Sequence, residues 1–262
     1  MALAISMVTF SDDPQSSVAD IQRDVSTKWP DLPSATDPDE NDDTLSYRIG
    51  STDVIMGKMR APIPWSDLEG PCATSVLWPK AADELKEHKT HVIVTVMGEL
   101  DPIELSTRLI QATASLMATS PTALGVFWAN ATLLVPKDLF IRFAVEVLPH
   151  GLPLHICVDF RVGNDGDKSS AGFTAGMAAL GHMELEAQNA AEPPGELRER
   201  FMGLASYVVE NGPVINDGDT VGEDANERIR VVYSDSAFGH EGKVMRLVYE
   251  QESPSKPWWK LW

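Results

Sequence analysis

Residues His91–Met97 read HVIVTVM, and this run marks the centre of the predicted fold. Five of its seven residues are β-branched, which is typical of a central strand in a sheet. A second buried strand is predicted at Ala2–Phe10, because the polar segment that starts at Ser11 ends this apolar run within one strand length. We therefore expect the N-terminal part of the chain to contain a sheet.

The segments between these two strands predict helices and further strands. Apolar residues recur three to four positions apart between Pro14 and Trp29, as on one face of a helix. The dipeptide Gly50-Ser51 predicts a hairpin turn. The elements predicted up to residue 100 are strand Ala2–Phe10, a helix that ends at Pro30, strands Leu45–Ile49 and Asp53–Arg60, helix Lys80–His88 and strand His91–Met97.

The rest of the chain predicts a similar order. Its elements are helix Pro102–Thr119, strand Ala123–Trp128, helix Lys137–Leu148, strands Leu154–Val162 and Gly172–Leu180, an extended piece Met183–Ala187, helix Glu196–Glu210, and strands Arg228–Tyr233 and Lys243–Tyr249. Both parts contain the order strand, helix, strand, strand, helix, strand, which is the ferredoxin-like arrangement. The sequence thus predicts an α+β protein of two ferredoxin-like halves, residues 1–100 and 101–252, with duplication as a hypothesis and packing as one compact unit.

The charge of the chain limits its partners. There are 39 acidic against 21 basic residues, which gives a formal net charge of -18. Such a surface repels nucleic acid and anionic membranes, and it attracts a basic protein by long-range steering. A simpler interpretation is that the acidity only keeps the protein in solution. We expect no nucleic acid and no membrane as partner.

The composition also predicts a location. The two cysteines, Cys72 and Cys157, have neither the spacing of a zinc site nor that of a disulfide framework, so a reducing cytoplasm is expected. No apolar run reaches the roughly 18 to 20 residues that span a bilayer. The segment 253–262 contains Trp258, Trp259 and Trp262, and we expect this tail to dock on the body of the protein.

Catalytic signatures are absent from the sequence. There is no nucleophile elbow, no phosphate-binding loop and no catalytic cysteine context, so neither catalytic residues nor a cofactor are predicted. His88 and His91 have a spacing that a metal could use, but a capping or hydrogen-bonding role is favoured because no third ligand is near. The other histidines, His150, His155, His182 and His240, stand alone in the sequence.

Acidic residues gather in three segments that contain turn-forming residues. Pro33–Asp43 has two prolines and no large apolar residue besides them, so an exposed acidic loop is predicted. Two further segments, at 165–167 and 217–224, combine Asp with Gly, which is typical of tight turns rather than of calcium loops. The candidate partner-binding residues are Asp37, Asp39, Glu40, Asp42, Asp43, Asp165, Asp167, Asp217, Asp219, Glu223 and Asp224.

Several short motifs resemble a bacterial family defined as domain of unknown function 4261. They lie between about residues 53 and 232, and the most distinctive is the block Gly218-Asp219-Thr220-Val221-Gly222, which also reads as a structural corner. The other motifs are Pro62-Ile63-Pro64-Trp65 with Asp67-Leu68-Glu69, Leu77-Trp78-Pro79, His88 with His91–Val94, Ala179–Glu186 and Asn211-Gly212-Pro213-Val214. The resemblance implies no activity.

Three functions remain open at this point. An acidic, motif-poor protein of this kind resembles, by analogy, the bacterial immunity proteins that block an antibacterial effector such as a nuclease, including effectors of type VI secretion. We expect such a non-enzymatic role, with a cognate toxin or another basic protein as partner. The alternatives are a hydrolase or other small-molecule enzyme whose site is assembled from distant His, Asp and Glu residues, and an oligomeric scaffold; no motif predicts the oligomeric state.

Overall fold

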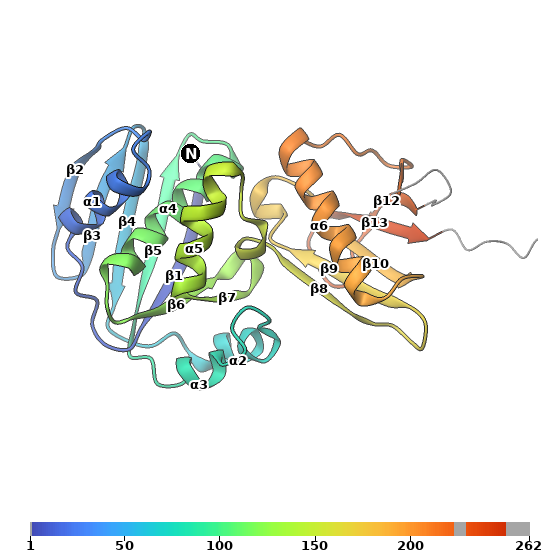
Figure 1. Cartoon of the computed structure of the whole chain (residues 1–262), viewed down its shortest axis with the longest axis horizontal. Helices are drawn as coiled ribbons and strands as arrows, with labels where there is room; N and C mark the ends of the chain where they lie inside the picture. The colour runs from blue at the N-terminus through green and yellow to red at the C-terminus, as the bar shows by residue number, and fades with distance from the viewer. Residues whose placement is uncertain (1, 223–228, 250–262) are drawn as a thin grey trace, which may run out of the picture. The chain divides into compact units, whose positions relative to one another are not determined.

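The chain forms two compact units, seen in Figure 1. The computed structural model describes residues 2–222 and 229–249. Unit 1 contains residues 1–159 and 179–181, and unit 2 contains residues 160–178 and 182–262. Both units combine helices with a sheet, so the predicted α+β class is confirmed. Within the described ranges, no helix has the length and apolar character needed to cross a membrane.

Unit 1 is built on a seven-stranded sheet in the order β2-β3-β4-β5-β1-β6-β7. The predicted central strand is confirmed as β5, which pairs antiparallel with β1 on one side and with β4 on the other. Val92, Val94 and Val96 are almost completely buried on one face of β5. The strands are β1 Ala2–Phe10, β2 Ala35–Glu40, β3 Thr44–Ile49, β4 Thr52–Met59, β5 Thr90–Gly98, β6 Ala123–Trp128 and β7 Leu133–Pro136.

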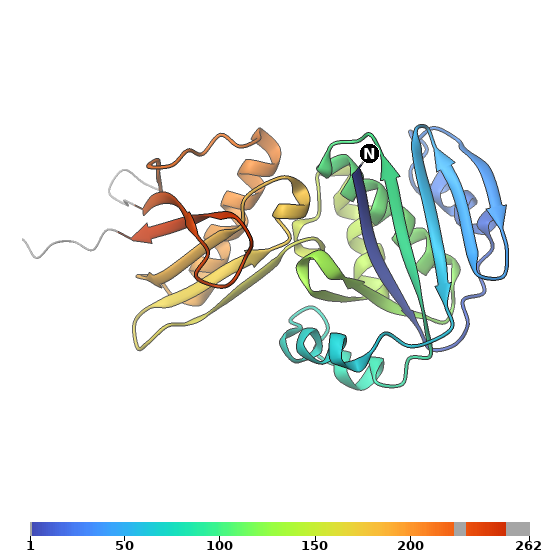
Figure 2. The ribbon, with the colours of Figure 1, turned by 180° about the vertical axis from the view of Figure 1, so that it is seen from behind.

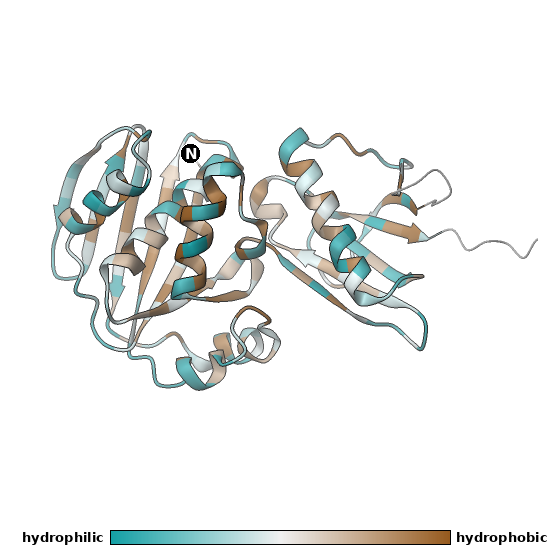
Figure 3. Ribbon diagram, in the orientation of Figure 1, coloured by the Kyte–Doolittle hydropathy of each residue, from teal (hydrophilic) through white to brown (hydrophobic). Residues whose placement is uncertain are grey.

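Three helices cover one face of this sheet (Figure 1). They are α1 Val18–Lys28, α4 Pro102–Thr119 and α5 Lys137–Arg142, of which α4 contacts both α1 and α5. The N-terminus of α4 is capped by Asp101, whose carboxylate accepts from the backbone N–H groups of Ile103 and Glu104, both at 2.9 Å. A buried hydrogen bond of 2.7 Å between Ser6 and Thr113 joins α4 to β1. Figure 3 shows apolar residues along the strands beneath these helices.

The opposite face of the sheet is covered only in part. The helices α2 Trp65–Thr74 and α3 Ala81–Leu85 bring a small apolar cluster, which includes Trp78, onto Phe127 of β6 and Leu134 of β7. Gly125 lies directly under Trp78, because a Cβ atom at this position would be 2.4 Å from the indole ring. No described helix of unit 1 crosses strands β3, β4, β5 and β1 on this side, as Figure 2 shows from behind.

The described residues of unit 2 form a six-stranded sheet and one α-helix. The order of strands is β11-β12-β13-β10-β9-β8, and β10 and β13 run parallel, whereas β12 and β13 run antiparallel. Helix α6 Pro194–Asn211 packs against β9 and β10 through Leu197, Phe201, Ala205 and Val208. The strands are β8 Asp159–Asn164, β9 Ser170–Ala175, β10 Leu185–Ala190, β11 Thr220–Val221, β12 Ile229–Asp235 and β13 Lys243–Tyr249.

The division of the chain differs from the predicted halves, 1–100 and 101–252. The units change near residue 159, because α4 packs on β1 and β5 and β6 pairs with β1. Residues 101–159 therefore complete the core of the first hundred residues instead of starting a second core. A seven-stranded sheet is also not a ferredoxin-like half, so the predicted duplication is not confirmed. The predicted tail, residues 253–262, lies outside the described residues.

Smaller elements also depart from the sequence prediction. Leu154–Ile156 forms a short 3-10 turn, and the strand predicted there starts only at Asp159. Helix α5 ends at Arg142, and the chain continues as a π-helical segment, Phe143–Val147, and a 3-10 turn, Leu148–His150, so helical structure extends past the predicted end at Leu148. Strands β7 and β11 were not predicted, because four and two residues are too short to show a period.

Candidate protein-binding surface

The acidic segment predicted as a loop is mostly a strand. Residues Ala35–Glu40 form β2, an edge strand that pairs antiparallel with β3. An edge strand pairs with a neighbouring strand on one side only, so it can form even where its side chains remain in water. Pro38 cannot donate a hydrogen bond and Asp37 has a φ of 49°, so the outer edge of β2 is a poor template for a further strand.

Three carboxylates of this hairpin remain exposed to water. Asp37 and Asp39 lie on β2, and Asp42 lies in the turn before β3. None of the three forms an ion pair with a Lys or Arg in the described part of the chain; Asp37 only accepts a hydrogen bond of 3.2 Å from the hydroxyl of Thr36. We call Asp37, Asp39 and Asp42 the acidic edge.

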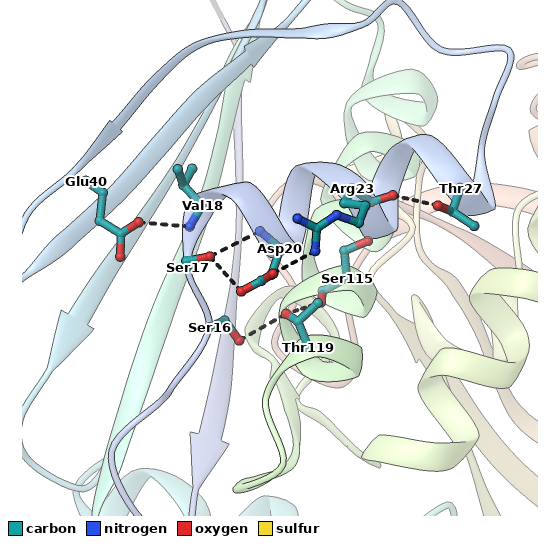
Figure 4. A network of polar contacts seen from close by, with 9 residues as sticks. All are labelled: Ser16, Ser17, Val18, Asp20, Arg23, Thr27, Glu40, Ser115 and Thr119. Carbon is teal, nitrogen blue, oxygen red and sulfur yellow. Dashed lines mark hydrogen bonds and ion pairs between the residues drawn. The ribbon is translucent and has the colours of Figure 1, made fainter.

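The other two acidic residues of the hairpin have structural contacts. The backbone N–H of Val18 donates to the carboxylate of Glu40 at 3.0 Å, which holds β2 against the first turn of α1 (Figure 4). Asp43 forms an exposed ion pair of 2.9 Å with Arg60. Glu40 and Asp43 are therefore less available to a partner than predicted.

Figure 4 shows that the start of α1 is held by a chain of polar contacts. Ser17 caps the helix by accepting from the N–H of Asp20 at 3.2 Å. The hydrogen bond from Ser17 and the nearby guanidinium of Arg23 lower the pKa of Asp20 below its usual value. Thr119 of α4 donates to Ser16 at 3.0 Å, so the loop before α1 is joined to the neighbouring helix.

A hollow of about 370 Å³ lies at one end of the hairpin. Its lining includes Asp13, Asp42, Lys58, Arg60 and Thr90. Because acidic and basic groups are mixed, this hollow has no preference for a ligand of one charge. Its lining residues do not form a set typical of a catalytic site.

The second predicted acidic segment is the turn between β8 and β9 in unit 2. The carboxylate of Asp165 accepts from the backbone N–H of Asn189 at 3.2 Å, and Gly166 has a φ of 97°. Asp165 therefore stabilises the turn, as expected for Asp in this position. Asp167 is exposed. Both residues belong to unit 2, whereas the acidic edge belongs to unit 1.

The third acidic segment is a structural corner. Asp217 accepts from the N–H of Tyr233 at 2.7 Å, and Asp219 accepts from the N–H of Asn216 at 2.7 Å. Gly218, with a φ of 89°, donates its N–H to the carbonyl of Val231 at 2.8 Å. The corner predicted for Gly218–Gly222 is thus explained by hydrogen bonds. Two further candidates, Glu223 and Asp224, lie outside the described residues.

A groove of about 400 Å³ with a mixed polar and apolar lining lies beside this corner and was not predicted. Tyr207 and Val214 contribute to it and are 50% and 45% exposed. Leu204, Ile215 and Val221 complete its apolar lining, and Asp219 adds a carboxylate. The exposed side chains of α6 show little hydrophobic periodicity, so the sequence pattern did not predict this groove.

Three buried glutamates were also missed. Glu184 accepts from the Thr174 hydroxyl at 2.7 Å and from the Gly176 N–H at 2.9 Å. Glu186 accepts from the Ser236 hydroxyl and from the N–H of Ala237, and so holds the turn after β12. The alternation Glu-Leu-Glu-Ala at 184–187 is typical of a half-exposed strand, so nothing in the sequence indicates burial of the carboxylates.

The third of these, Glu192, follows β10. It forms a salt bridge of 2.9 Å with Arg200 of α6 and accepts from the hydroxyl of Tyr249. Burial, together with the carboxylate of Glu192, raises the pKa of Tyr249 above its usual value. All three glutamates are satisfied by protein groups, so their role is to connect elements of unit 2.

His88 and His91 have the predicted hydrogen-bonding role. The Nε2 atom of His88 accepts from the N–H of Ile63 at 2.8 Å, and its Nδ1 atom lies 2.6 Å from the carbonyl of Leu85, to which it donates. The Nδ1 atom of His91 donates to the carbonyl of Ala61 at 2.8 Å, while burial lowers its pKa. Both rings therefore support the segment that leads from β4 to α2.

The remaining histidines have different surroundings. His155 stacks on Phe143 with a centroid distance of 5.7 Å, and His240 makes an edge contact with Phe173 at 5.2 Å. His182 is partly buried, which lowers its pKa. Across residues 2–222 and 229–249, no group of three His, Cys, Asp or Glu side chains could hold a metal ion. His150 is exposed.

The two cysteines are buried and unpaired. Burial raises the pKa of both thiols, most strongly that of Cys157. A thiol with a raised pKa is a poor nucleophile at neutral pH. Neither cysteine therefore provides the activated nucleophile that an enzyme would need.

The uncovered part of the unit 1 sheet is apolar. Residues that are paired across neighbouring strands point to the same face of a sheet. One such row, from β2 to β1, consists of Asp39, Ser46, Ile55, Thr95 and Ile5. The next rows add Leu3 and Met97, which are opposite each other, and Ile93. We call Leu3, Ile5, Ile55, Ile93, Thr95 and Met97 the open face. Leu3 is 55% exposed and the other five are partly exposed.

Comparison with known proteins gives one match. Residues 173–248 match a family described as a domain of unknown function (DUF4261). No curated protein and no solved structure is similar enough to match the chain. The matched segment contains the buried Glu184 and Glu186, helix α6 and the corner at Gly218–Gly222. Over these residues, therefore, the chain is similar to a family for which no activity is described.

Proposed function

We propose that this protein is a non-enzymatic, cytoplasmic binding protein that neutralises a basic protein partner. In this proposal the partner is an antibacterial effector, such as a nuclease delivered by type VI secretion, and the protein acts as an immunity protein. The acidic edge carries this proposal. Its three carboxylates are exposed and have no cation of the described chain to neutralise them.

Physical chemistry supports a role for these charges in association. The whole chain has a net charge of -18, which accelerates the encounter with a basic protein over distances of about one Debye length. Carboxylates without an internal partner can pair with Lys or Arg side chains of another protein without breaking an existing ion pair. For a nuclease, an acidic surface would compete with the phosphates that the enzyme binds.

The enzyme alternative has less support from the described residues. His88 and His91 are engaged with backbone groups, and His155 and His240 are in ring contacts. Both cysteines are buried thiols. A small-molecule enzyme would require an acid, a base and a binding cavity in one place. The hollows that are lined by Asp42, by Asp167 and by Asp219 have no histidine or cysteine among their lining residues.

The proposal is tested with a partner purified from the native cell. Tagged full-length protein retains its partner from an extract; the retained protein is identified, produced separately and studied by association kinetics. We expect a basic partner whose association rate falls steeply with NaCl. A variant with Asp37→Asn, Asp39→Asn and Asp42→Asn should associate about three- to tenfold more slowly at low salt.

A matched variant controls for the change in total charge. Glu69→Gln, Glu87→Gln and Glu199→Gln remove three exposed carboxylates elsewhere, so the net charge changes equally. This variant should slow association much less. The proposal is wrong if no basic protein is retained, or if the two triple variants slow association equally.

A further inference from the structure

The open face of unit 1 has the composition of a binding surface. It combines five apolar side chains with Thr95, and it lies opposite the face that α1, α4 and α5 cover. The row of Leu3 and Met97 continues with two charged residues, Asp53 of β4 and Arg48 of β3. These two form an ion pair of 2.9 Å and so neutralise each other. A sheet face of this kind is unusual on the surface of a protein that carries a net charge of -18.

Register places Asp39 of the acidic edge on the same face. Asp39 is opposite Ser46, which is opposite Ile55, so the carboxylate of Asp39 belongs to the side of the sheet that contains the open face. Glu40, one residue further, belongs to the other side, where it contacts α1. The surface is therefore apolar across β4, β5 and β1, and it becomes acidic at β2.

We infer that the open face is the contact surface for the basic partner, with the acidic edge as its rim; this inference rests on the proposed function. Interfaces between proteins have an apolar centre that determines residence time and a charged rim that determines association rate. The order of residues across the sheet provides both parts on one surface. The partner should have an apolar centre, with Lys or Arg on the side that meets β2.

Charge argues against a second copy as the occupant. Two copies would bring together net charges of -18 each, and Asp39, which has no ion-pair partner within residues 2–222 and 229–249, would add repulsion at the rim. A basic protein instead gains from the same charges.

The inference is tested by blocking the centre of the open face. Thr95→Cys creates a single accessible thiol, because Cys72 and Cys157 are buried, and it is labelled with a polyethylene-glycol maleimide. The unlabelled variant should bind the purified partner as the wild type does, which shows that the substitution itself is tolerated. The labelled variant should bind at least about tenfold more weakly.

A label elsewhere provides the control. Val145, which is 40% exposed on the segment after α5, is changed to Cys and labelled in the same way. This protein should keep its affinity within about twofold. Equal affinity of the two labelled proteins contradicts the inference while leaving the proposed function intact.

Two further results would also overturn it. If the protein forms dimers that the label at position 95 dissociates, the occupant is a second copy. If no basic partner exists, the proposed function fails, and this inference fails with it.

Discussion

At the scale of single residues, Gly125 has the tightest surroundings of the glycines in the unit 1 sheet. A Cβ atom there would be 2.4 Å from the indole of Trp78 and 2.5 Å from the carbonyl oxygen of Val135. Because the carbonyl belongs to the adjacent strand, it cannot move without disturbing the pairing of β6 and β7. We expect Gly125→Ala to lower the free energy of unfolding by about 1 to 3 kcal/mol, measured by urea titration with tryptophan fluorescence.

Gly57 provides the matched control. It lies in β4 of the same sheet, and a Cβ atom at this position would have no neighbour within 4 Å. Gly57→Ala should leave stability unchanged or raise it slightly, because the alanine restricts the unfolded chain. Equal destabilisation by the two substitutions would show that the contact with Trp78 does not explain the glycine.

At the scale of elements, Glu186 joins strand β10 to the turn between β12 and β13. Its carboxylate is completely buried and accepts from Ser236 and from the N–H of Ala237, with Arg246 at 3.9 Å. Glu186→Ala leaves these donors without an acceptor. We expect a loss of about 3 to 5 kcal/mol in the stability of unit 2 and faster hydrogen exchange at the Ala237 amide.

An exposed carboxylate in the same hairpin serves for comparison. Asp235 forms an ion pair with Lys243 in which both side chains are largely exposed to water. Asp235→Ala should change stability little and should leave exchange at Ala237 unaffected. A similar effect of the two substitutions would mean that burial of Glu186 does not matter to the turn.

At the scale of the whole molecule, the excess of negative charge destabilises the folded state by repulsion. The carboxylates of the acidic edge have no ion-pair partner among the described residues, so they contribute to this repulsion. Raising NaCl from about 0.05 to 0.5 M shortens the Debye length from roughly 14 to 4 Å. We therefore expect the thermal midpoint to rise, and KCl should give the same rise at equal ionic strength.

The triple variant of the acidic edge tests where the repulsion arises. With Asp37→Asn, Asp39→Asn and Asp42→Asn, the midpoint at low salt should be higher and its increase with NaCl smaller than in the wild type. Differential scanning calorimetry measures both quantities. A midpoint that falls with salt would indicate that surface ion pairs such as Arg60 with Asp43 outweigh the repulsion.

Local pattern was sufficient for the long, regular elements. Strand β1 and helix α4 follow from apolar runs and periodicity, and β5 follows from its β-branched residues. The hairpin between β3 and β4 follows from Gly50, whose φ of 60° suits glycine. The hydrogen-bonding role of His88 and His91 could also be expected from their positions.

The acidic segments show what the local sequence pattern does not predict. Composition identified residues 37–43 as exposed, yet it could not separate Asp39, which has no ion-pair partner among the described residues, from Glu40, which contacts the N-terminus of α1. These neighbours differ because successive residues of a strand point to opposite faces. Which face holds a helix depends on residues far away in the chain.

The sequence by itself determined the α+β class, the main helices and strands and the negative charge, because these depend on neighbouring residues or on composition alone. Only the tertiary structure decided the boundary near residue 159, the burial of Glu184 and Glu186, and the open face beside the acidic edge. Each of these depends on strand pairing and register between distant segments, and a change of one residue in register would move every side chain to the other face.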